Sequence, residues 1–327
     1  DKGGVVHCPE LVTRLLAGGH EITSHTYSHI LFGWKPLVYG RRKYLSGLEP
    51  VVQDLKKLHG TMEKGWGYPI RLSRPPHYVD GIKGGFTSYD AYALMGYQYM
   101  AASFDGAGWL PLASYEAEVE ATWKPMERIL LENPDYFRGQ IIFQKDGFNM
   151  ARRTPVADGL DKQLQLLTDH GYKVVTVSEL LERSPFRDAL PSSDIGAAAR
   201  RLLGHGWCVA FQDNTLRPDT VLTRGALAML AFGCETIRQR IKLVRSGRAP
   251  FRDMAPRHPY AAAAVLADET GALRAENGRF RPDAPVTPEE LRRFFEVRLG
   301  RSCGDIPSQI THGQFFLLAD SLMGRGQ

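Results

Sequence analysis

The chain has 327 residues, of which 43% are hydrophobic and 24% charged, a composition typical of globular proteins. Its formal net charge of +5 and isoelectric point near 9.0 suit an acidic partner. The Lys and Arg residues are scattered, with no run long enough to follow a phosphate backbone, so we predict no nucleic-acid binding. No apolar stretch approaches the length of a membrane span. The four cysteines lie far apart without a CxxC pair, which indicates neither a disulfide framework nor a zinc finger.

The first half of the chain alternates helical patterns with short apolar segments. "PELVTRLLAGG" has the apolar spacing of a helix, and it begins so early that we expect the natural N-terminus to lie upstream. Strands are predicted at "YQYMAAS", "GQIIFQ" and "KVVTV", the last between the helix "LDKQLQLLTDH" and a short helix. This order predicts an α/β architecture with a parallel sheet over residues 1–184.

His25 and His29 stand four residues apart in "GGHEITSHTYSHI". On a helical turn, positions i and i+4 project from one face, so two imidazoles could bind one metal ion. Catalytic zinc usually has three protein ligands, and the pair therefore needs a third donor. The alternative is a polar segment at the end of a strand that uses these side chains for capping and hydrogen bonding.

From residue 185 the sequence repeats itself. PFRD recurs at 185 and 250, and RPD recurs at 217 and 281, so two motifs keep nearly one offset. Thr223, Thr287 and Thr311 each stand where a helix N-cap is expected. We predict a first repeat at 185–235, a basic connector at 236–249, a second repeat at 250–297 and a partial third at 298–327.

The first half resembles the polysaccharide deacetylase (NodB-homology) family over residues 8–182. "HTYSH" is similar to its second motif, "RLSRPPHY" to its third, with His77 in place of an aromatic residue, and "AASFDGAGWL" to its fourth. "GQIIFQKDG" and "GYKVVTVSELL" resemble the fifth motif and its tail. The first motif, T-F-D-D-G, is absent because the chain begins after it. The implied fold is an incomplete, distorted β/α barrel of the deacetylase type without its N-terminal strands.

This resemblance implies metal-dependent hydrolysis of N-acetyl groups on a cell-wall or chitin-like polysaccharide. His25 and His29 would bind Zn²⁺ or another divalent ion, with the third ligand from an upstream aspartate. Arg74 would orient a catalytic carboxylate, unless it is a surface residue before a proline turn. Lys145 stands where the family has histidine, and it either assists the leaving amine in a changed role or marks a binding protein.

Two further residues follow from the same resemblance. Asp105 and Trp109 would bind substrate, the indole providing a flat face for a sugar ring. The alternative for Trp109 is packing in the core. Both residues lie in the segment similar to the fourth motif.

The repeats resemble S-layer homology modules, which have an F-x-D start and an F-x-P-D…T-R-A-E middle. Modules of this kind imply an all-α-rich domain that binds an anionic secondary cell-wall polymer, with Arg224 as the binding residue and an extracellular location at a bacterial wall. Stacking of such small units is expected whether or not they bind a polymer. Two hypotheses follow: a wall-attached N-deacetylase, or a non-catalytic glycan-binding or surface-layer protein on a degenerate deacetylase fold.

Overall fold

The computed structural model describes residues 2–36, 42–106, 108–145, 147–211 and 213–324. Its contacts divide the chain into two compact units. Unit 1 comprises Asp1–Thr13, Thr23–Gln98 and Arg183–Gln327, and unit 2 comprises Arg14–Ile22 and Tyr99–Glu182. Across the described ranges, we find no helix with the length and apolar character needed to span a membrane.

The first part of unit 1 is built from helices with short strands between them. Its elements are α1 (Lys2–His7), α3 (Leu48–Trp66), β1 (Leu72–Ser73), the 3₁₀ helix η1 (Pro76–Tyr78), β2 (Gly81–Ile82), β3 (Phe86–Thr87), α4 (Ser88–Met95) and β4 (Gln98–Tyr99). Helix α2 (Pro9–Ala17), predicted from the sequence, continues from unit 1 into unit 2. The longest helix, α3, buries one apolar face and ends at Gly67, whose φ of 63° lies in the left-handed region.

The strands pair two by two. β1 pairs with β4, β2 pairs antiparallel with β3, and β5 (Phe104–Asp105) pairs parallel with β6 (Ile142–Phe143). The α/β content and the parallel pair agree with the sequence prediction. The incomplete barrel is not confirmed by these short pairs and stays a prediction.

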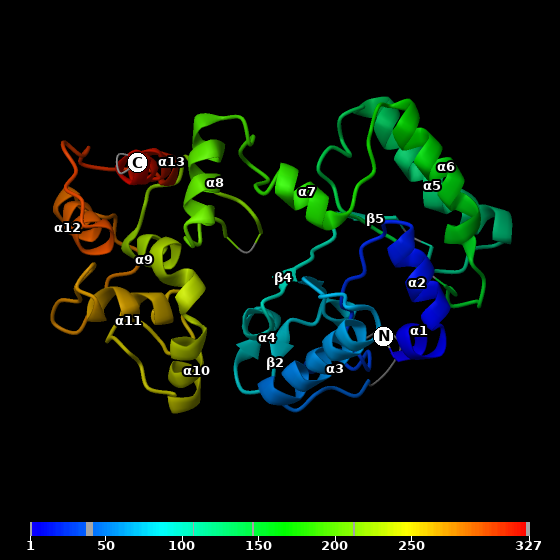
Figure 1. The fold of residues 1–327 in the computed structure, drawn as a ribbon, viewed down its shortest axis with the longest axis horizontal. Helices are drawn as coiled ribbons and strands as arrows, with labels where there is room; N and C mark the ends of the chain where they lie inside the picture. The colour runs from blue at the N-terminus through cyan, green and yellow to red at the C-terminus, as the bar shows by residue number, and fades with distance from the viewer. Residues whose placement is uncertain (1, 37–41, 107, 146, 212, 325–327) are drawn as a thin grey trace. The chain divides into compact units, whose positions relative to one another are not determined.

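Unit 2 consists mainly of two long helices that lie side by side (Figure 1). These are α5 (Tyr115–Glu132) and α6 (Pro155–Asp169), followed by α7 (Val177–Arg183). Their core is small, with Met126, Leu130 and Phe137 packed against Leu166 and Leu167. The strand predicted at "KVVTV" is wrong, because residues 172–176 make no ladder and the helix α7 begins at Val177.

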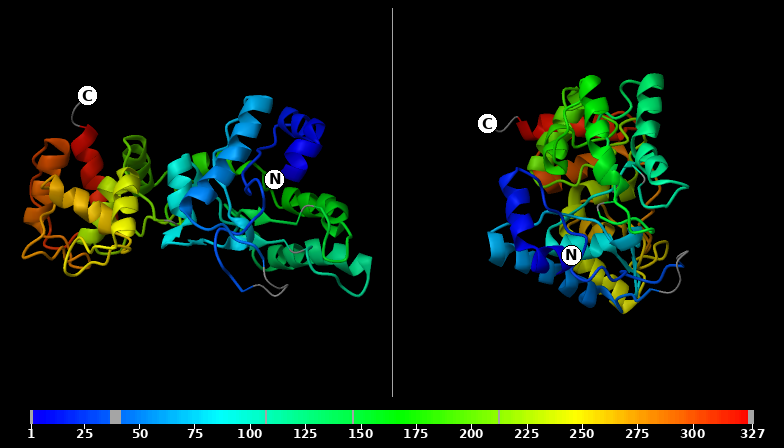
Figure 2. Two further views of the ribbon diagram at one scale, coloured as in Figure 1. Left: turned by 90° about the horizontal axis from the view of Figure 1, so that it is seen from below. Right: turned by 90° about the vertical axis from the view of Figure 1, so that its right-hand side faces the viewer.

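Residues 185–324, named here the repeat region, form a cluster of helices (Figure 2). Their buried apolar side chains make one continuous hydrophobic core. The helices are α8 (Asp194–Gly204), α9 (Arg224–Phe232), the 3₁₀ turn η2 (Gly233–Glu235), α10 (Ile237–Ser246), α11 (Ala261–Glu269), α12 (Pro288–Leu299) and α13 (His312–Gly324). Thr223 and Thr287 are the N-caps of α9 and α12, and each hydroxyl accepts the amide three residues on. Thr311 precedes α13, and its hydroxyl accepts from the amide of Gln314. The three capping predictions are therefore confirmed.

The same contacts recur where the sequence repeats. The carboxylate of Asp188 accepts from the amides of Leu216 at 2.7 Å and Arg217 at 2.8 Å. The carboxylate of Asp253 accepts likewise from Phe280 at 3.0 Å and Arg281 at 2.8 Å. Both arginines have left-handed backbones, with φ of 51° for Arg217 and 57° for Arg281. The aspartate of each PFRD motif thus fixes the RPD turn of the same unit.

Candidate active site

Residues 24–29, named here the histidine segment, form bends and not a helical turn on which positions i and i+4 share one face. Thr26 and His29 have left-handed φ values of 70° and 56°. The Asp54 carboxylate accepts from the amides of Tyr27 at 2.9 Å and Ser28 at 3.3 Å, while the Thr26 hydroxyl accepts from His29 N at 3.0 Å. These side-chain acceptors take the amide groups that a helix would pair with its own carbonyls, so the chain bends.

The segment is anchored to β1. Ser24 bridges Ser73 in parallel, and Ser24 N donates to the Leu72 carbonyl at 2.9 Å. The next bond runs the other way, from Arg74 N to the Ser24 carbonyl at 3.0 Å. This short ladder brings His25 beside the backbone of Arg74, although the two residues are 49 positions apart.

His25 and His29 do lie together despite the absence of a helix. Their ring centroids are 4.9 Å apart with an interplanar angle of 68°. His25 Nδ1 lies 2.8 Å from the Arg74 carbonyl, which can only accept, so Nδ1 carries the proton and Nε2 keeps its lone pair. Burial lowers the pKa of His25 to about 4, although the bond to Arg74 opposes that change. The ring is therefore neutral at physiological pH, the form in which imidazole binds metals.

A third imidazole adjoins the pair. The ring centroid of His77 lies 5.6 Å from that of His29, at 64° between the planes. His77 and Tyr78 both have φ of 53° within η1, which turns the chain sharply after the prolines. The Arg74 guanidinium stacks over Tyr78 at 5.2 Å from its ring centroid and donates to the Tyr78 hydroxyl at 3.4 Å. The backbone of Arg74 thus contacts the histidine segment, while its side chain contacts η1.

These residues meet the needs of a metal ion only in part. The Nδ1–H bond to a carbonyl is the outer contact that metal-bound histidines usually make. Within the part of the chain that the structure describes, however, no three His, Cys, Asp or Glu side chains are grouped so that they could hold an ion. His77 lies beside His29 but does not complete a three-ligand group with the pair, so the described residues leave the ligand set incomplete.

The other candidate residues of the deacetylase-like half belong to unit 2. Asp105 is the last residue of β5, and Lys145 follows the neighbouring strand β6 by two positions, so both stand at one end of the parallel pair. Both side chains are exposed. Trp109 is half-buried, and its carbonyl accepts from Met150 N at 3.2 Å. Asp105, Trp109 and Lys145 remain predictions as functional residues.

Unit 2 also contains a buried carboxylate that the sequence did not single out. Glu118 on α5 is 1% exposed and accepts from Leu112 N and Asn149 Nδ2, both at 2.9 Å, and from Arg153. Burial favours the neutral acid, but these donors outweigh it and hold the pKa of Glu118 below its ordinary value. Only the fold identifies this residue, because its partners come from loops far along the sequence.

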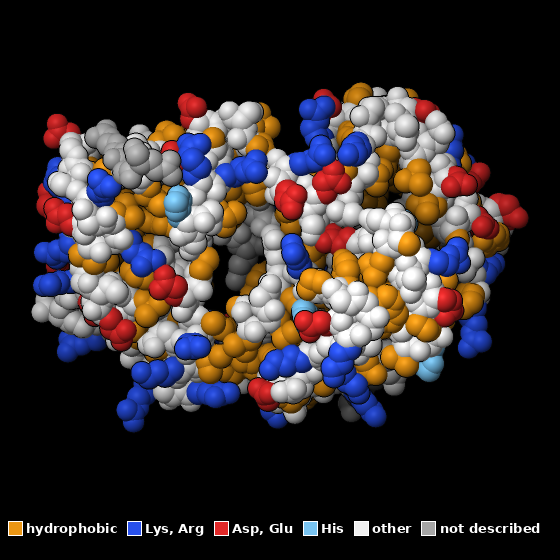
Figure 3. Space-filling view, viewed as in Figure 1, with side chains coloured by type: hydrophobic (Ala, Val, Ile, Leu, Met, Phe, Trp, Pro, Cys, Tyr) orange, Lys and Arg blue, Asp and Glu red, His pale blue; other side chains and the backbone are white. Residues whose placement is uncertain are grey.

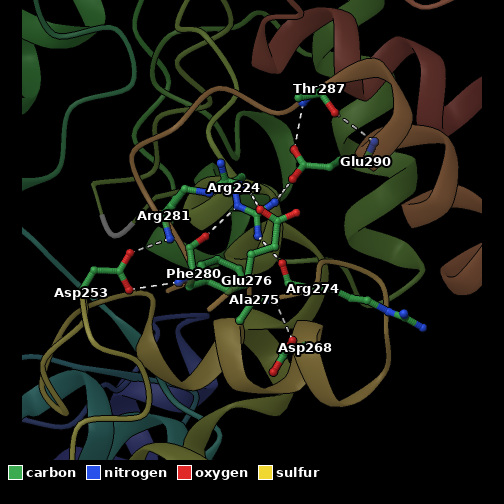
Figure 4. Close-up of polar contacts among 10 residues, drawn as sticks. All are labelled: Arg224, Asp253, Asp268, Arg274, Ala275, Glu276, Phe280, Arg281, Thr287 and Glu290. Carbon is green, nitrogen blue, oxygen red and sulfur yellow. Dashed lines mark hydrogen bonds and ion pairs between the residues drawn. The ribbon is translucent and has the colours of Figure 1, made fainter. Parts of the chain in front are cut away.

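Arg224, the predicted polymer-binding residue, lies inside the repeat region with 1% of its surface exposed (Figure 4). Its Nε donates to the Phe280 carbonyl at 2.7 Å and its Nη2 to the Arg274 carbonyl at 2.8 Å. Its Nη1 pairs with Glu290, the residue that also closes the capping box of α12. The guanidinium thus ties the first repeat to the second.

A disulfide joins Cys208, which lies between α8 and α9, to Cys234 in η2, directly after α9. The two cysteines are 26 residues apart, a spacing that matches no cysteine motif, so this bond was not predicted from the sequence. Cys8 and Cys303 are free thiols. Disulfides persist mainly in oxidising compartments. The bond therefore favours an oxidising compartment, a question on which the cysteine spacing alone was not informative.

Comparison with known proteins gives a match over about half of the chain. No family model matches. The peptidoglycan-N-acetylmuramic acid deacetylase PdaC of Bacillus subtilis is 27% identical over 194 residues, which are 57% of this chain and 32% of that protein. The chain therefore spans about a third of the length of this relative.

Two solved structures are also similar. The peptidoglycan deacetylase PdaC from Bacillus subtilis shares 22% identity, with 55% of this chain and 72% of that chain covered and a TM-score of 0.39. The chitin deacetylase from the fungal pathogen Colletotrichum lindemuthianum shares 18% identity, with 54% and 69% covered and a TM-score of 0.41. The sequence match supports a domain of the polysaccharide deacetylase type in about half of the chain.

Proposed function

We propose that the chain is part of a bacterial cell-wall protein that hydrolyses N-acetyl groups of peptidoglycan or a chitin-like polysaccharide. The observation that carries this proposal is the pairing of His25 with His29, in which the Arg74 carbonyl fixes the Nδ1–H tautomer of His25. The match to PdaC, whose name describes a peptidoglycan deacetylase, supports the same reaction class.

In this proposal His25 and His29 provide two ligands for Zn²⁺ or another divalent ion, and an aspartate upstream of residue 1 provides the third. Such an ion polarises a carbonyl and acidifies bound water. Because the described ligand set is incomplete, no step is assigned to the ion here. The chain's own contributions are the neutral imidazoles, Arg74 as the residue that orients a carboxylate, and Lys145 as the group near the leaving amine. Asp105 and Trp109 would bind the sugar.

The proposed extracellular location has separate support. The Cys208–Cys234 disulfide favours an oxidising environment. The two equivalent aspartate contacts in the repeat region support the internal duplication that resembles S-layer homology modules. We propose the repeat region as the part that attaches the protein to an anionic wall polymer.

The test is acetate release from an N-acetylated glycan by the protein extended at its N-terminus to include the first motif. Activity is expected to fall by orders of magnitude with a chelator and in the H25Q and H29Q variants. The H205Q variant, which changes an exposed histidine after α8, is the matched control and is expected to retain activity. Release that is insensitive to the chelator and to both substitutions would contradict the proposal.

The second candidate is a glycan-binding protein without catalysis. It is favoured by Lys145, which stands where the related enzymes have histidine and is exposed. The extended protein would then bind the glycan, retain it on a column and release no acetate. The two candidates therefore give opposite results in one assay.

A further inference from the structure

The basic connector between the repeats forms the helix α10, Ile237–Ser246. Its charged residues are all cationic, and Arg238, Lys242 and Arg245 occur at positions i, i+4 and i+7, which share one face of a helix. Leu243 and Val244 are buried on the opposite face. The helix therefore packs against the core with one side and presents a straight row of cations with the other.

The row is exposed, and none of its cations pairs with an acidic side chain among the residues that the structure describes. The side chains of Arg238, Lys242 and Arg245 are exposed, and so is that of Arg248, just after the C-cap Gly247. No ion pair of these four is found in the described ranges, whereas Arg240, on another side of the helix, pairs with Asp90. In Figure 3, Lys and Arg side chains gather over α10 at the lower edge of the view.

We infer that this cationic row of α10 (Arg238, Lys242 and Arg245, continued by Arg248) is the surface through which the repeat region contacts an anionic glycan polymer. The three helical cations span about 10 Å, close to the Debye length at physiological salt. Their fields therefore overlap, and a polymer with several carboxylates or phosphates gains from all of them at once. The inference rests on the proposed wall attachment but moves the contact away from Arg224, whose donors are occupied inside the core.

The chemistry of the row favours a glycan over nucleic acid. Single-stranded nucleic acids bind through aromatic stacking combined with positive charge, and α10 has no aromatic residue. The Cys208–Cys234 disulfide in the same region also favours a compartment that contains wall polymers. A polyanionic carbohydrate is therefore the partner that the surface fits.

Binding can be measured by fluorescence anisotropy of the full chain with labelled polygalacturonate, a carboxylate-bearing glycan, with neutral dextran and single-stranded DNA as further probes. The test variant is R238Q/K242Q/R245Q. The control variant, R200Q/R293Q/R301Q, removes three exposed cations elsewhere in the repeat region, so that the loss of net charge is the same. Circular dichroism verifies that both variants are folded.

We expect wild-type protein to bind polygalacturonate and not dextran, with affinity that falls between about 50 and 200 mM salt. The α10 variant should bind about tenfold more weakly or worse at the lower salt, and the control variant within about threefold of wild type. Equal loss in both variants, no loss in the α10 variant, or tighter binding to DNA than to polygalacturonate would overturn the inference. Wild type that binds no polyanion would overturn wall attachment as well, whereas acetate release tests the deacetylase proposal separately.

Discussion

Arg224 in the repeat region and His25 and His29 in the histidine segment were all predicted to bind ligands, but they differ in burial. Arg224 lies within the core, whereas the two histidines are half-buried. The guanidinium of Arg224 donates to two backbone carbonyls and pairs with Glu290. His25 and His29 adjoin each other on a bent backbone, with left-handed φ values at Thr26 and His29. Left-handed residues also occur in the repeat region, at Arg217 and Arg281, so the contrast depends on the burial and the partners of the side chains.

This difference teaches that a motif residue can act in two ways. Arg224 has the partners of a residue that holds two repeats in register, while His25 and His29 are half-buried and lie with their rings side by side. Substitutions in the repeat region should therefore change stability most, and those in the histidine segment should change function most. The following predictions test this contrast.

Arg224→Met should have the largest effect on stability. It leaves the carbonyls of Phe280 and Arg274 without donors and Glu290 without its cation. Breaking a buried ion pair costs about 3–5 kcal/mol. Chemical denaturation followed by circular dichroism measures the loss. Arg200→Met, at an exposed position of α8, is the control and should change the free energy of unfolding by no more than about 0.5 kcal/mol. Similar losses in both variants would show that the buried network does not stabilise the repeats.

Reduction of the Cys208–Cys234 disulfide should have the next largest effect. Opening a loop of this length costs about 3 kcal/mol through the greater freedom of the unfolded chain. A reducing agent should therefore lower the free energy of unfolding of the wild type and leave a C208S/C234S variant unchanged. The C8S variant, which removes the free thiol of Cys8 and keeps the disulfide, should respond to reduction like the wild type. If the reducing agent does not change the free energy of unfolding of the wild type, then the disulfide does not stabilise the fold.

The sequence predicted local features of both regions better than contacts between distant residues. The helix α2 and the N-caps Thr223 and Thr287 were correct because each depends on neighbours within one turn. No helical turn forms at His25, because Asp54, more than twenty residues on, accepts from the amides of Tyr27 and Ser28. The predicted proximity of His25 and His29 is still confirmed, because residues only four positions apart stay close on a bent backbone as well.

The hydrogen-bond partners of buried charged side chains could not be predicted from the sequence. Nothing near Glu118 in the sequence reveals that Asn149 and Arg153 will bind it. The burial of Arg224 depends on the carbonyl groups of Phe280 and Arg274, which carry no side-chain signal at all. Motif matching therefore identified the residue type that matters and left its role open.

Acidification should weaken the repeat region through His312. This residue stands at the position of Arg224 in the third unit, is 1% exposed, and stacks on Phe211 with ring centroids 5.5 Å apart. Burial lowers the pKa of His312, the bond from its Nδ1 to the Leu216 carbonyl opposes this, and the cation Arg217 lowers it further. The His312 ring therefore takes up a proton at a lower pH in the folded chain than in the unfolded chain.

The sign of the effect follows from linkage. Because the fold lowers the pKa of His312, its ring takes up a proton more readily in the unfolded chain once the pH falls below the ordinary histidine pKa of about 6.5. His312 therefore contributes its full stability above about pH 6.5, and this contribution is lost as the pH falls, by at most about 1.4 kcal/mol per pH unit. Denaturation at pH 7.5 and 5.5 should show a smaller pH dependence in H312Q than in the wild type. Equal pH dependence in the two proteins would exclude His312 as the titrating group.

His29→Asn should have the smallest effect on stability, and it tests the other side of the contrast. Asparagine tolerates the left-handed φ of 56° at this half-buried position, so the change in the free energy of unfolding should stay within about 1 kcal/mol. His29→Val, which places a β-branched residue at the same φ, should lose about 1–3 kcal/mol from backbone strain. In the N-terminally extended protein, both variants should lose acetate release, because each removes the imidazole. If His29→Asn destabilises the chain as much as Arg224→Met does, then the histidine segment is part of the structural framework. The expected contrast in stability between the histidine segment and the repeat region would then be wrong.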